Sequence, residues 1–351
     1  MHSSLVHLRH GGDKLPAVIV DNYSLQLQEG DGFVGDSASR TAFRAMLGEW
    51  RKLFKSLHGE DTLGKKATTD ISKKNLDALL AEKGPAAAII LSAMEDYAQQ
   101  LADVVQRFMA EPGWRGVERV IIGGGFKESA VGRRAIKRTA ELLASRHAHV
   151  DLRPLHHHAD EGGLIGWLHL APTKLLARYP ALMAVDIGGT NVRCAIVRMR
   201  ADPAGQTEGA PPKAQVIAHE KWGHADDGAT RREDLIQGVA GMLEGLIRHA
   251  EKRRIPLAPF VGVACPGHIR EDGSIAAGAQ NLPGDWEGRD FHLPLELCER
   301  LPRIDDHETA VRMHNDAVVQ GLSDLPYNRD VRRWAVLTVG TGLGNACFTN
   351  R

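Results

Sequence analysis

Apolar residues recur along the chain at two spacings, and each spacing predicts one kind of secondary structure. From Lys73 to Met109 they recur at helical intervals with a break near Gly84-Pro85, which predicts two helices. Further helices are predicted from about Ala130 to Arg146 and from Asp234 to Lys252. Short β-branched runs lie between these segments, so strands and helices alternate and the sequence predicts an α/β fold.

The predicted strands share one feature, which is that each runs into a glycine or proline turn. The segment Val192–Met199 follows one of these turns and predicts the second arm of a hairpin. The residues Ala201–Lys213 are rich in Gly, Pro and Ala, which predicts an exposed loop. The strands are Val117–Ile122, Ala181–Asp186, Phe260–Ala264 and Trp334–Val339.

Composition narrows the class of protein and of partner. The chain has 351 residues, 43% hydrophobic and 25% charged, which suits two lobes because single cores stop growing at roughly 250 to 300 residues. Lys plus Arg equal Asp plus Glu at 44 each, so no global field attracts nucleic acid or a charged membrane and the expected partners are small molecules. Scattered cysteines, an N-terminus without an apolar signal core and the absence of a long apolar run predict a cytoplasmic protein.

A carboxylate and two glycines stand at the turn of the predicted hairpin. The residues are Asp186, Gly188, Gly189, Thr190 and Asn191. Glycines let backbone N–H groups approach phosphate oxygens, and the nearby carboxylate can hold a hydrated magnesium ion. The alternative is an ordinary hairpin whose turn needs a positive φ.

Two further segments could take part in phosphoryl transfer. The run Gly340-Thr341-Gly342-Leu343-Gly344 could form a second phosphate-binding turn at the end of a strand. The pair Asn315-Asp316 precedes a predicted helix, and a carboxylate there can serve as the general base for a substrate hydroxyl. The alternative for Asp316 is a helix N-cap.

Taken together, these motifs resemble those of the ROK family of sugar kinases, which are related to hexokinase. The resemblance implies an α/β, two-lobed actin-like ATPase (ribonuclease H-like) fold with the active site in the cleft between the lobes. The matching segments are Asp186–Arg193 for the first phosphate motif, Gly262–Gly267 and Asn281–Trp286 for the sugar-lining segment, Asn315–Ala317 for the catalytic aspartate, and Gly340–Gly344 for the second phosphate motif.

The order of the motifs differs from the family's order. The segment Val120–Gly125 resembles the family's adenosine motif, and Gly162–Leu168 resembles a helix that follows that motif. Both segments come before the first phosphate motif here, whereas in ROK kinases they come late. A circular permutation is the simplest interpretation, and an unrelated domain over residues 1–175 is the alternative. The interpretation as a circular permutation assigns residues 1–176 to the large lobe with the adenosine motif, 177–315 to the small lobe, and 316–351 to the rest of the large lobe.

The resemblance also implies roles for residues and cofactors. It implies ATP and Mg²⁺ as cofactors, with Asp186 positioning the magnesium ion through water and Asp316 as the base. Asn281 and Asn315 are the candidates for sugar contacts. The remaining glycines, Gly123, Gly124 and Gly125, would lie beneath the nucleoside, and a homodimer is a family expectation only.

Some family features are missing, and some apparent motifs are not functional. The Gly-Glu-x-Gly-His segment that contacts the sugar and the cysteine-rich zinc motif are not found, so no zinc ion is expected and the sugar could be atypical. The run Gly59–Lys66 lacks the last residue of a Walker A loop, and His156–His158 are read as a solvated loop. The competing functions are a catalytically inactive sugar-binding or regulatory protein and an ATPase switch.

Overall fold

The computed structural model describes residues 9–30, 32–199, 214–229 and 231–351, and the chain forms two compact units. Unit 1 comprises Met1–Ser24, Asp160–Asp330 and Phe348–Arg351, and unit 2 comprises Leu25–Ala159 and Val331–Cys347. The predicted boundaries after residues 176 and 315 both lie inside unit 1. The predicted loop 201–213 lies outside the described residues.

Unit 1 is built on a five-stranded sheet of order β12-β9-β6-β7-β8. Three consecutive strands, β6, β7 and β8, pair antiparallel, while β9 pairs parallel with β6 and β12 parallel with β9. The predicted hairpin of β6 and β7 is therefore confirmed. The bounds are β6 Ala181–Ile187, β7 Val192–Met199, β8 Ala214–Trp222, β9 Leu257–Cys265 and β12 Ala310–Asn315.

Helices cover both faces of this sheet, which is why β6 and β9 are buried along their whole length. One face, with Met183 and Val185, packs against α8 and α9. On the other face, Trp167 of α6 packs on Gly262, where a Cβ atom would lie 2.1 Å from the indole ring. The bounds are α5 Ala159–Ile165, α6 Trp167–Leu170, α7 Thr173–Arg178, α8 Arg232–Arg253, α9 Leu293–Arg300 and α10 Asp316–Ser323.

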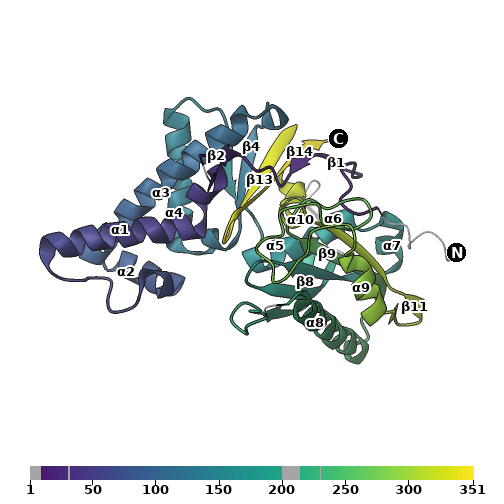
Figure 1. Cartoon of the computed structure of the whole chain (residues 1–351). Coiled ribbons are helices and arrows are strands. Elements are labelled where there is room, and N and C mark those ends of the chain that lie inside the picture. The colour runs from purple at the N-terminus through teal and green to yellow at the C-terminus, as the bar shows by residue number, and fades with distance from the viewer. Residues whose placement is uncertain (1–8, 31, 200–213, 230) are drawn as a thin grey trace, which may run out of the picture. The chain divides into compact units, whose positions relative to one another are not determined.

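Unit 2 combines a group of helices with part of the second five-stranded sheet, of order β1-β14-β13-β4-β5. Helix α3 packs against α1 and α4 (Figure 1), and its buried face supplies much of the core of this unit. The bounds are α1 Arg40–His58, α2 Lys73–Ala81, α3 Pro85–Ala110, α4 Ala130–Ser145, β4 Arg119–Gly123, β5 Asp151–Pro154 and β13 Arg333–Val339.

The strand β14, Leu343–Asn350, passes from unit 2 into unit 1 between Cys347 and Phe348. Its last residues lie beside β1, Val18–Tyr23, and the Arg351 N–H donates to the Ala17 carbonyl at 3.1 Å. The short strands are β2 Gln28–Glu29, β3 Gly32–Phe33, β10 Arg303–Ile304 and β11 His307–Glu308.

The two sheets have the same layout but differ in the order in which the chain visits the strands. In the first sheet, the consecutive strands β6, β7 and β8 are followed by β9 and β12 on the other side of β6. In the second, β13 takes the place of β6, and β14 and β1 take the places of β7 and β8. Strands β4 and β5 lie on the other side of β13, paired parallel, as β9 and β12 do beside β6.

The predicted α/β class is confirmed, because the chain combines two five-stranded sheets with helices that alternate with their strands. The pair of helices predicted over residues 73–109 is confirmed as α2 and α3, which begins at Pro85 where the ring suits a first helical position. In the described ranges, none of the helices combines the length and the apolar character that crossing a bilayer requires.

Candidate active site

The candidate site of unit 1 lies where three neighbouring strands end. Asp186 of β6 pairs in register with Ala264 of β9, and Cys265 of β9 pairs with Asn315 of β12. Because these three strands run in the same direction, their carboxyl ends share one edge of the sheet, which is where open α/β sheets bind ligands. The sheet therefore brings the first phosphate motif, the Pro266-Gly267 turn and Asp316 to one edge.

Asp186 is a nearly buried carboxylate with one ion-pair partner. It is 8% exposed, and its Oδ2 lies 3.2 Å from Nη1 of Arg193. Burial raises the pKa of Asp186, and the positive charge of Arg193 opposes that rise. Gly163 of α5 lies against it, since a Cβ atom there would be 2.7 Å from the carboxylate carbon. The close approach explains why this position is glycine.

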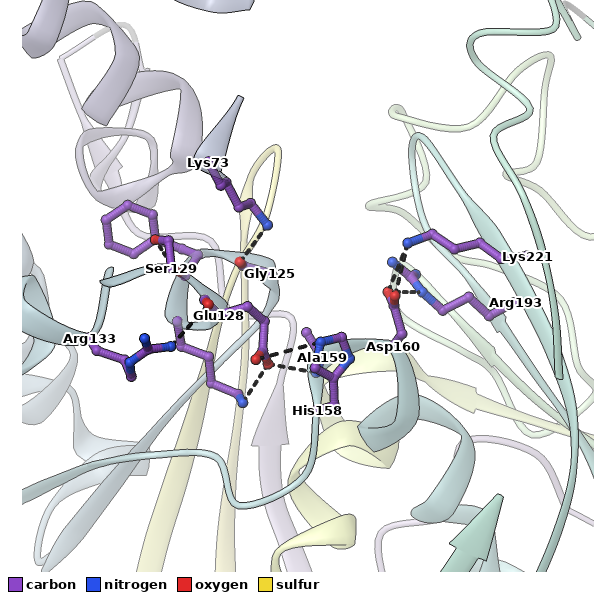
Figure 2. Close-up of polar contacts among 12 residues, drawn as sticks. Lys73, Gly125, Glu128, Ser129, Arg133, His158, Ala159, Asp160, Arg193 and Lys221 are labelled. Atoms are coloured by element: carbon purple, nitrogen blue, oxygen red, sulfur yellow. Dashed lines mark hydrogen bonds and ion pairs between the residues drawn. The ribbon is translucent and has the colours of Figure 1, made fainter. Parts of the chain in front are cut away.

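Arg193 belongs to a small network of charges that continues to the start of α5 (Figure 2). Its Nε donates to Asp160 at 2.6 Å, and Nζ of Lys221 donates to the same carboxylate at 2.9 Å. Burial acts to raise the pKa of Asp160, but Lys221 and Arg193 together lower it below its usual range. Arg193 is thereby held between two carboxylates, and its orientation toward Asp186 is fixed.

The turn Gly188–Asn191 is closed by hydrogen bonds rather than by unusual backbone angles. The Gly188 N–H donates to the Asn191 carbonyl at 2.9 Å, and the Asn191 amide donates to the Thr190 hydroxyl at 2.9 Å. Neither Gly188 nor Gly189 has a positive φ, so the ordinary-hairpin alternative does not account for them. The close approach of another segment explains Gly189, because a Cβ atom there would lie 3.0 Å from Cβ of Asn281.

The segment that contains Asn281 therefore contacts the Gly188–Asn191 turn. Asn281 is exposed at this contact, and its backbone carbonyl also lies close to Gly189. The structure brings these two predicted site residues together although 92 positions separate them in the sequence (281 minus 189).

Asn315, and not Asp316, caps helix α10. The Oδ1 atom of Asn315 accepts from the N–H groups of Ala317 and Val318 at 3.0 and 3.2 Å, and its Nδ2 donates to the Gly267 carbonyl at 3.0 Å. The amide is thus used to fix the start of the helix and to bind the Pro266-Gly267 turn. Asp316 is the first helical residue, so the N-cap alternative does not explain it.

The environment of Asp316 is unfavourable for a negative charge. Burial, followed by the nearby charge of Asp186, raises the pKa of Asp316 from 3.8 to about 6, against the hydrogen bond from the Ala317 N–H. Two carboxylates that share a site resist ionising together. A carboxylate with a pKa near the working pH is suited to accept a proton from a hydroxyl.

The remaining predicted residues lie in unit 2, where two glycine turns meet. Strands β4 and β13 pair in parallel, with Thr338 beside Gly123, so the turns that follow them lie at one edge. Gly124 has φ +80°, and a Cβ atom there would lie 2.2 Å from the Val339 carbonyl oxygen. The Gly340 carbonyl accepts from the Arg40 N–H at 3.0 Å, while Thr341 is exposed.

A pocket lies beside the first of these turns. Its walls combine apolar side chains with three cations, and Nζ of Lys73 donates to the Gly125 carbonyl at 2.6 Å (Figure 2). The lining residues are Arg40, Phe43, Arg44, Lys73, Leu76, Phe126, Ser129 and Val131. Apolar walls with nearby cations suit a group that has both an aromatic and an anionic part.

Several residues at these sites were not predicted. His224 is 1% exposed, and its Nε2 donates to the Gly188 carbonyl at 2.9 Å, while its Nδ1 has no hydrogen-bond partner among the residues that the structure describes. In unit 2, the side chain of Lys73 in α2 contacts the Gly125 carbonyl, and the backbone N–H of Arg40 in α1 contacts the Gly340 carbonyl. Only the tertiary fold brings these residues to the turns, and no local motif marks them.

Among the residues described, no three His, Cys, Asp or Glu side chains gather as a metal site. A magnesium ion held through water needs fewer protein ligands, because Mg²⁺ keeps several waters and takes one or two carboxylates. Asp186 fits this use, since Arg193 pairs with Oδ2 and no described residue hydrogen-bonds to Oδ1.

Comparison with known proteins gives weak likenesses. No family model and no curated protein matches the chain. Among solved structures, the Lmo2764 protein of Listeria monocytogenes, a proposed N-acetylmannosamine kinase, is 21% identical with a TM-score of 0.34, over 48% of this chain and 47% of the other. A proposed sugar kinase from Cytophaga hutchinsonii is 17% identical with a TM-score of 0.34, over 48% of each chain. The Ppx/GppA phosphatase of Aquifex aeolicus is 11% identical with a TM-score of 0.21, over 38% of this chain and 35% of the other. The chain thus spans about half the length of the two kinase structures.

Proposed function

We propose that the protein is a kinase that transfers the γ-phosphoryl group of ATP to a sugar hydroxyl. The observation that carries this proposal is the edge of the unit 1 sheet, where Asp316 lies near Asp186 with a pKa of about 6. Phosphoryl transfer needs little covalent help from a protein, and it depends on a base, on positioned phosphates and on neutralised charge.

Asp316 is the proposed general base. Its carboxylate accepts the proton of the sugar hydroxyl while that oxygen attacks the γ-phosphorus and the bond to the bridging oxygen of ADP breaks. Asn315 fixes the start of α10 and thereby positions Asp316. The pKa of about 6 leaves the carboxylate mostly ionised at pH 7 while keeping it a stronger base than an exposed aspartate.

Asp186 is the residue proposed to hold the magnesium ion, through its water shell. The ion would neutralise charge on the phosphates. Arg193 keeps the carboxylate of Asp186 oriented, and the N–H groups of the Gly188–Asn191 turn are the proposed phosphate contacts. Exposed Asn281, next to this turn, is the proposed sugar contact.

The glycine turns of unit 2 are proposed to bind the rest of the nucleotide. Gly340–Gly344 would contact phosphates, with exposed Thr341 as a hydroxyl donor, and Gly123–Gly125 would contact the nucleoside. The apolar and cationic pocket beside Gly125 supports this assignment.

We also propose that the chain is a circular permutation of the ROK arrangement. The two sheets share one layout if the second is read in the order β13, β14, β1, β4, β5. Read that way, the strand beside β14 comes from residues 18–23, and the adenosine-like turn after β4 follows it. The strand order supports the permuted interpretation over an unrelated domain in residues 1–175, since β1 and β4 complete the sheet of β13 and β14.

The test is turnover with a panel of sugars. Purified protein is incubated with ATP, Mg²⁺ and hexoses, amino sugars or N-acetylated sugars, and ADP release is followed beside the Asp316→Asn variant. The variant keeps the shape of the side chain but cannot accept the proton, so we expect a loss of about 10²- to 10⁴-fold in kcat. Asp306→Asn is the matched control, because Asp306 is an exposed carboxylate of the same unit.

The outcomes separate the functions. Sugar-dependent ADP release that the Asp316→Asn substitution abolishes supports the kinase. ATP hydrolysis that no sugar accelerates would indicate an ATPase switch instead. Stabilisation by a sugar without turnover would indicate a sugar-binding or regulatory protein.

A further inference from the structure

Residues 9–24, the described part of the N-terminal segment, pack against the candidate site. His10 accepts a hydrogen bond from the Met313 N–H at 3.0 Å, and the Gly11 N–H donates to the Met313 carbonyl at 3.1 Å. This places the N-terminal segment beside β12 just before Asn315 and Asp316. The segment therefore forms part of the surroundings of the site, although no sequence motif assigns it there.

Three rings connect this segment to the site. Tyr23, at the end of β1, stacks on His268 with ring centroids 5.1 Å apart and an angle of 14° between the planes. The same ring lies 5.4 Å from His314 in a tilted arrangement. His314 is fixed in turn, because its Nε2 donates to the Gly12 carbonyl at 3.0 Å and its Nδ1 accepts from the Asn315 N–H at 2.8 Å.

The backbone of His268 is equally well held. His268 donates to the Ala277 carbonyl and accepts from the Ala276 N–H, both at 2.8 Å. The preceding Gly267 carbonyl accepts from Asn315, next to Asp316. Tyr23 is anchored as well, since its hydroxyl donates to the Ile269 carbonyl at 3.0 Å. The imidazole of His268 thus has a fixed position, directly after the Gly267 carbonyl that Asn315 binds.

The imidazole of His268 nevertheless has unused hydrogen-bonding capacity. The side chain is exposed, and neither ring nitrogen bonds to any residue that the structure describes. A neutral imidazole offers one donor and one acceptor. A polar group that is held rigidly yet left without a protein partner is well prepared to bind a ligand, because little conformational freedom is lost on binding.

We propose that His268, held by Tyr23, is a substrate-specificity residue that hydrogen-bonds a sugar hydroxyl neighbouring the one that Asp316 deprotonates. The charges at this edge indicate the class of sugar. Asp186 and Asp316 are carboxylates, and Arg193 is already bonded to Asp160 and Asp186. An uncharged sugar fits this edge better than a sugar phosphate or a sugar acid. The inference rests on the proposed kinase function.

The test compares the active sugar with its monodeoxy analogues in the wild-type protein and the His268→Ala variant. We expect wild type to lose about tenfold or more in kcat/KM on one particular deoxy analogue, and His268→Ala to lose a similar factor on the parent sugar. The decisive result is that His268→Ala no longer distinguishes that analogue from the parent. The KM for ATP should change less than about twofold, because His268 is not among the phosphate contacts.

Further variants keep the test independent of folding. His268→Gln retains a donor and an acceptor and should recover part of the discrimination. Tyr23→Phe retains the stacked ring and should resemble wild type, whereas Tyr23→Ala should resemble His268→Ala. His219→Ala is the matched control, since His219 is an exposed histidine on β8 of the same unit. Thermal unfolding of each variant identifies any that fail to fold.

The outcomes distinguish this inference from the function on which it rests. A wild-type protein that phosphorylates sugars, with His268→Ala and His268→Gln both keeping the full deoxy discrimination, would overturn the role of His268 and leave the kinase intact. Preference for a sugar phosphate or sugar acid would overturn the inferred substrate class. A wild-type protein that neither turns over nor is stabilised by any sugar would overturn both proposals.

Discussion

Replacing Asp316 by asparagine should abolish turnover and yet stabilise the folded protein. The pKa of Asp316 is raised from 3.8 to about 6, because burial and the charge of Asp186 disfavour the ionised carboxylate. Each tenfold change in an acid constant is worth about 1.4 kcal/mol, so the ionised Asp316 costs the fold about 3 kcal/mol. An asparagine has the same shape without the charge, and the variant should recover an amount of this order at neutral pH.

The direction of the pKa shift of Asp316 determines the pH range over which the stability of wild type and variant should differ. A carboxyl whose pKa is higher in the folded state binds its proton more tightly there, so its contribution to stability is present at low pH. That contribution is lost as the pH rises from about 4 to about 6. The free energy of unfolding of Asp316→Asn should therefore match that of wild type near pH 4. It should exceed the wild-type value by a growing amount up to about pH 7.

Urea unfolding measured from pH 4 to pH 8 checks this expectation. Asp306→Asn is the control, because exposed carboxylates away from such sites usually change stability by less than about 0.5 kcal/mol. A stability difference between wild type and Asp316→Asn that stays constant with pH would refute the reasoning. So would a variant that is less stable than wild type at pH 7, since Asp316 would then be a favourable charge.

Three further predictions concern the same edge of the unit 1 sheet. In wild type, kcat/KM should rise with pH through about 6 and level off above it, because only ionised Asp316 accepts the proton; a pH–rate profile measures this, and a flat profile would exclude Asp316 as the base. Gly163→Ala places a methyl group where a Cβ atom lies 2.7 Å from the Asp186 carboxylate, so stability should fall by about 1 to 3 kcal/mol and turnover should fall with it, as urea unfolding and ADP release would show. His224→Ala removes the hydrogen bond to the Gly188 carbonyl and should raise the KM for ATP, while His224→Gln, whose amide can replace the Nε2 donor, should raise it less; equal KM values for the two variants would contradict this role.

Much of the candidate site could be proposed from the sequence because its residues occur in short, contiguous motifs. The Asp186–Asn191 turn, Asn315-Asp316 and the glycine runs each combine a strand end with residues whose chemistry is plain from their type. The roles within a motif were harder to assign. Asn315 was predicted to contact the sugar, whereas its amide caps α10 and bonds the Gly267 carbonyl, and whether it also contacts a sugar remains a prediction.

The helix α1 was not predicted, although it is 19 residues long. Its capping signal, Ser39 with the Ala42 N–H, is clear only when the helix is known. Ser and Thr residues are common in loops as well as at helix starts, so a single cap is a weak indication. Its buried residues Phe43 and Leu47 are few, since its apolar face is completed by contact with α3.

The sequence by itself determined the local features of this protein: the α/β alternation, the hairpin of β6 and β7, the glycine turns, and Asp186 and Asp316 as candidate site residues. These follow from side-chain period and turn chemistry, which act over a few residues. The tertiary structure decided which strands and which side chains are in contact. It placed β1 next to β14, Gly163 against Asp186, His224 on the Gly188 carbonyl and Tyr23 on His268. Such contacts join residues far apart in the chain, and they depend on strand order and packing, which no local pattern encodes.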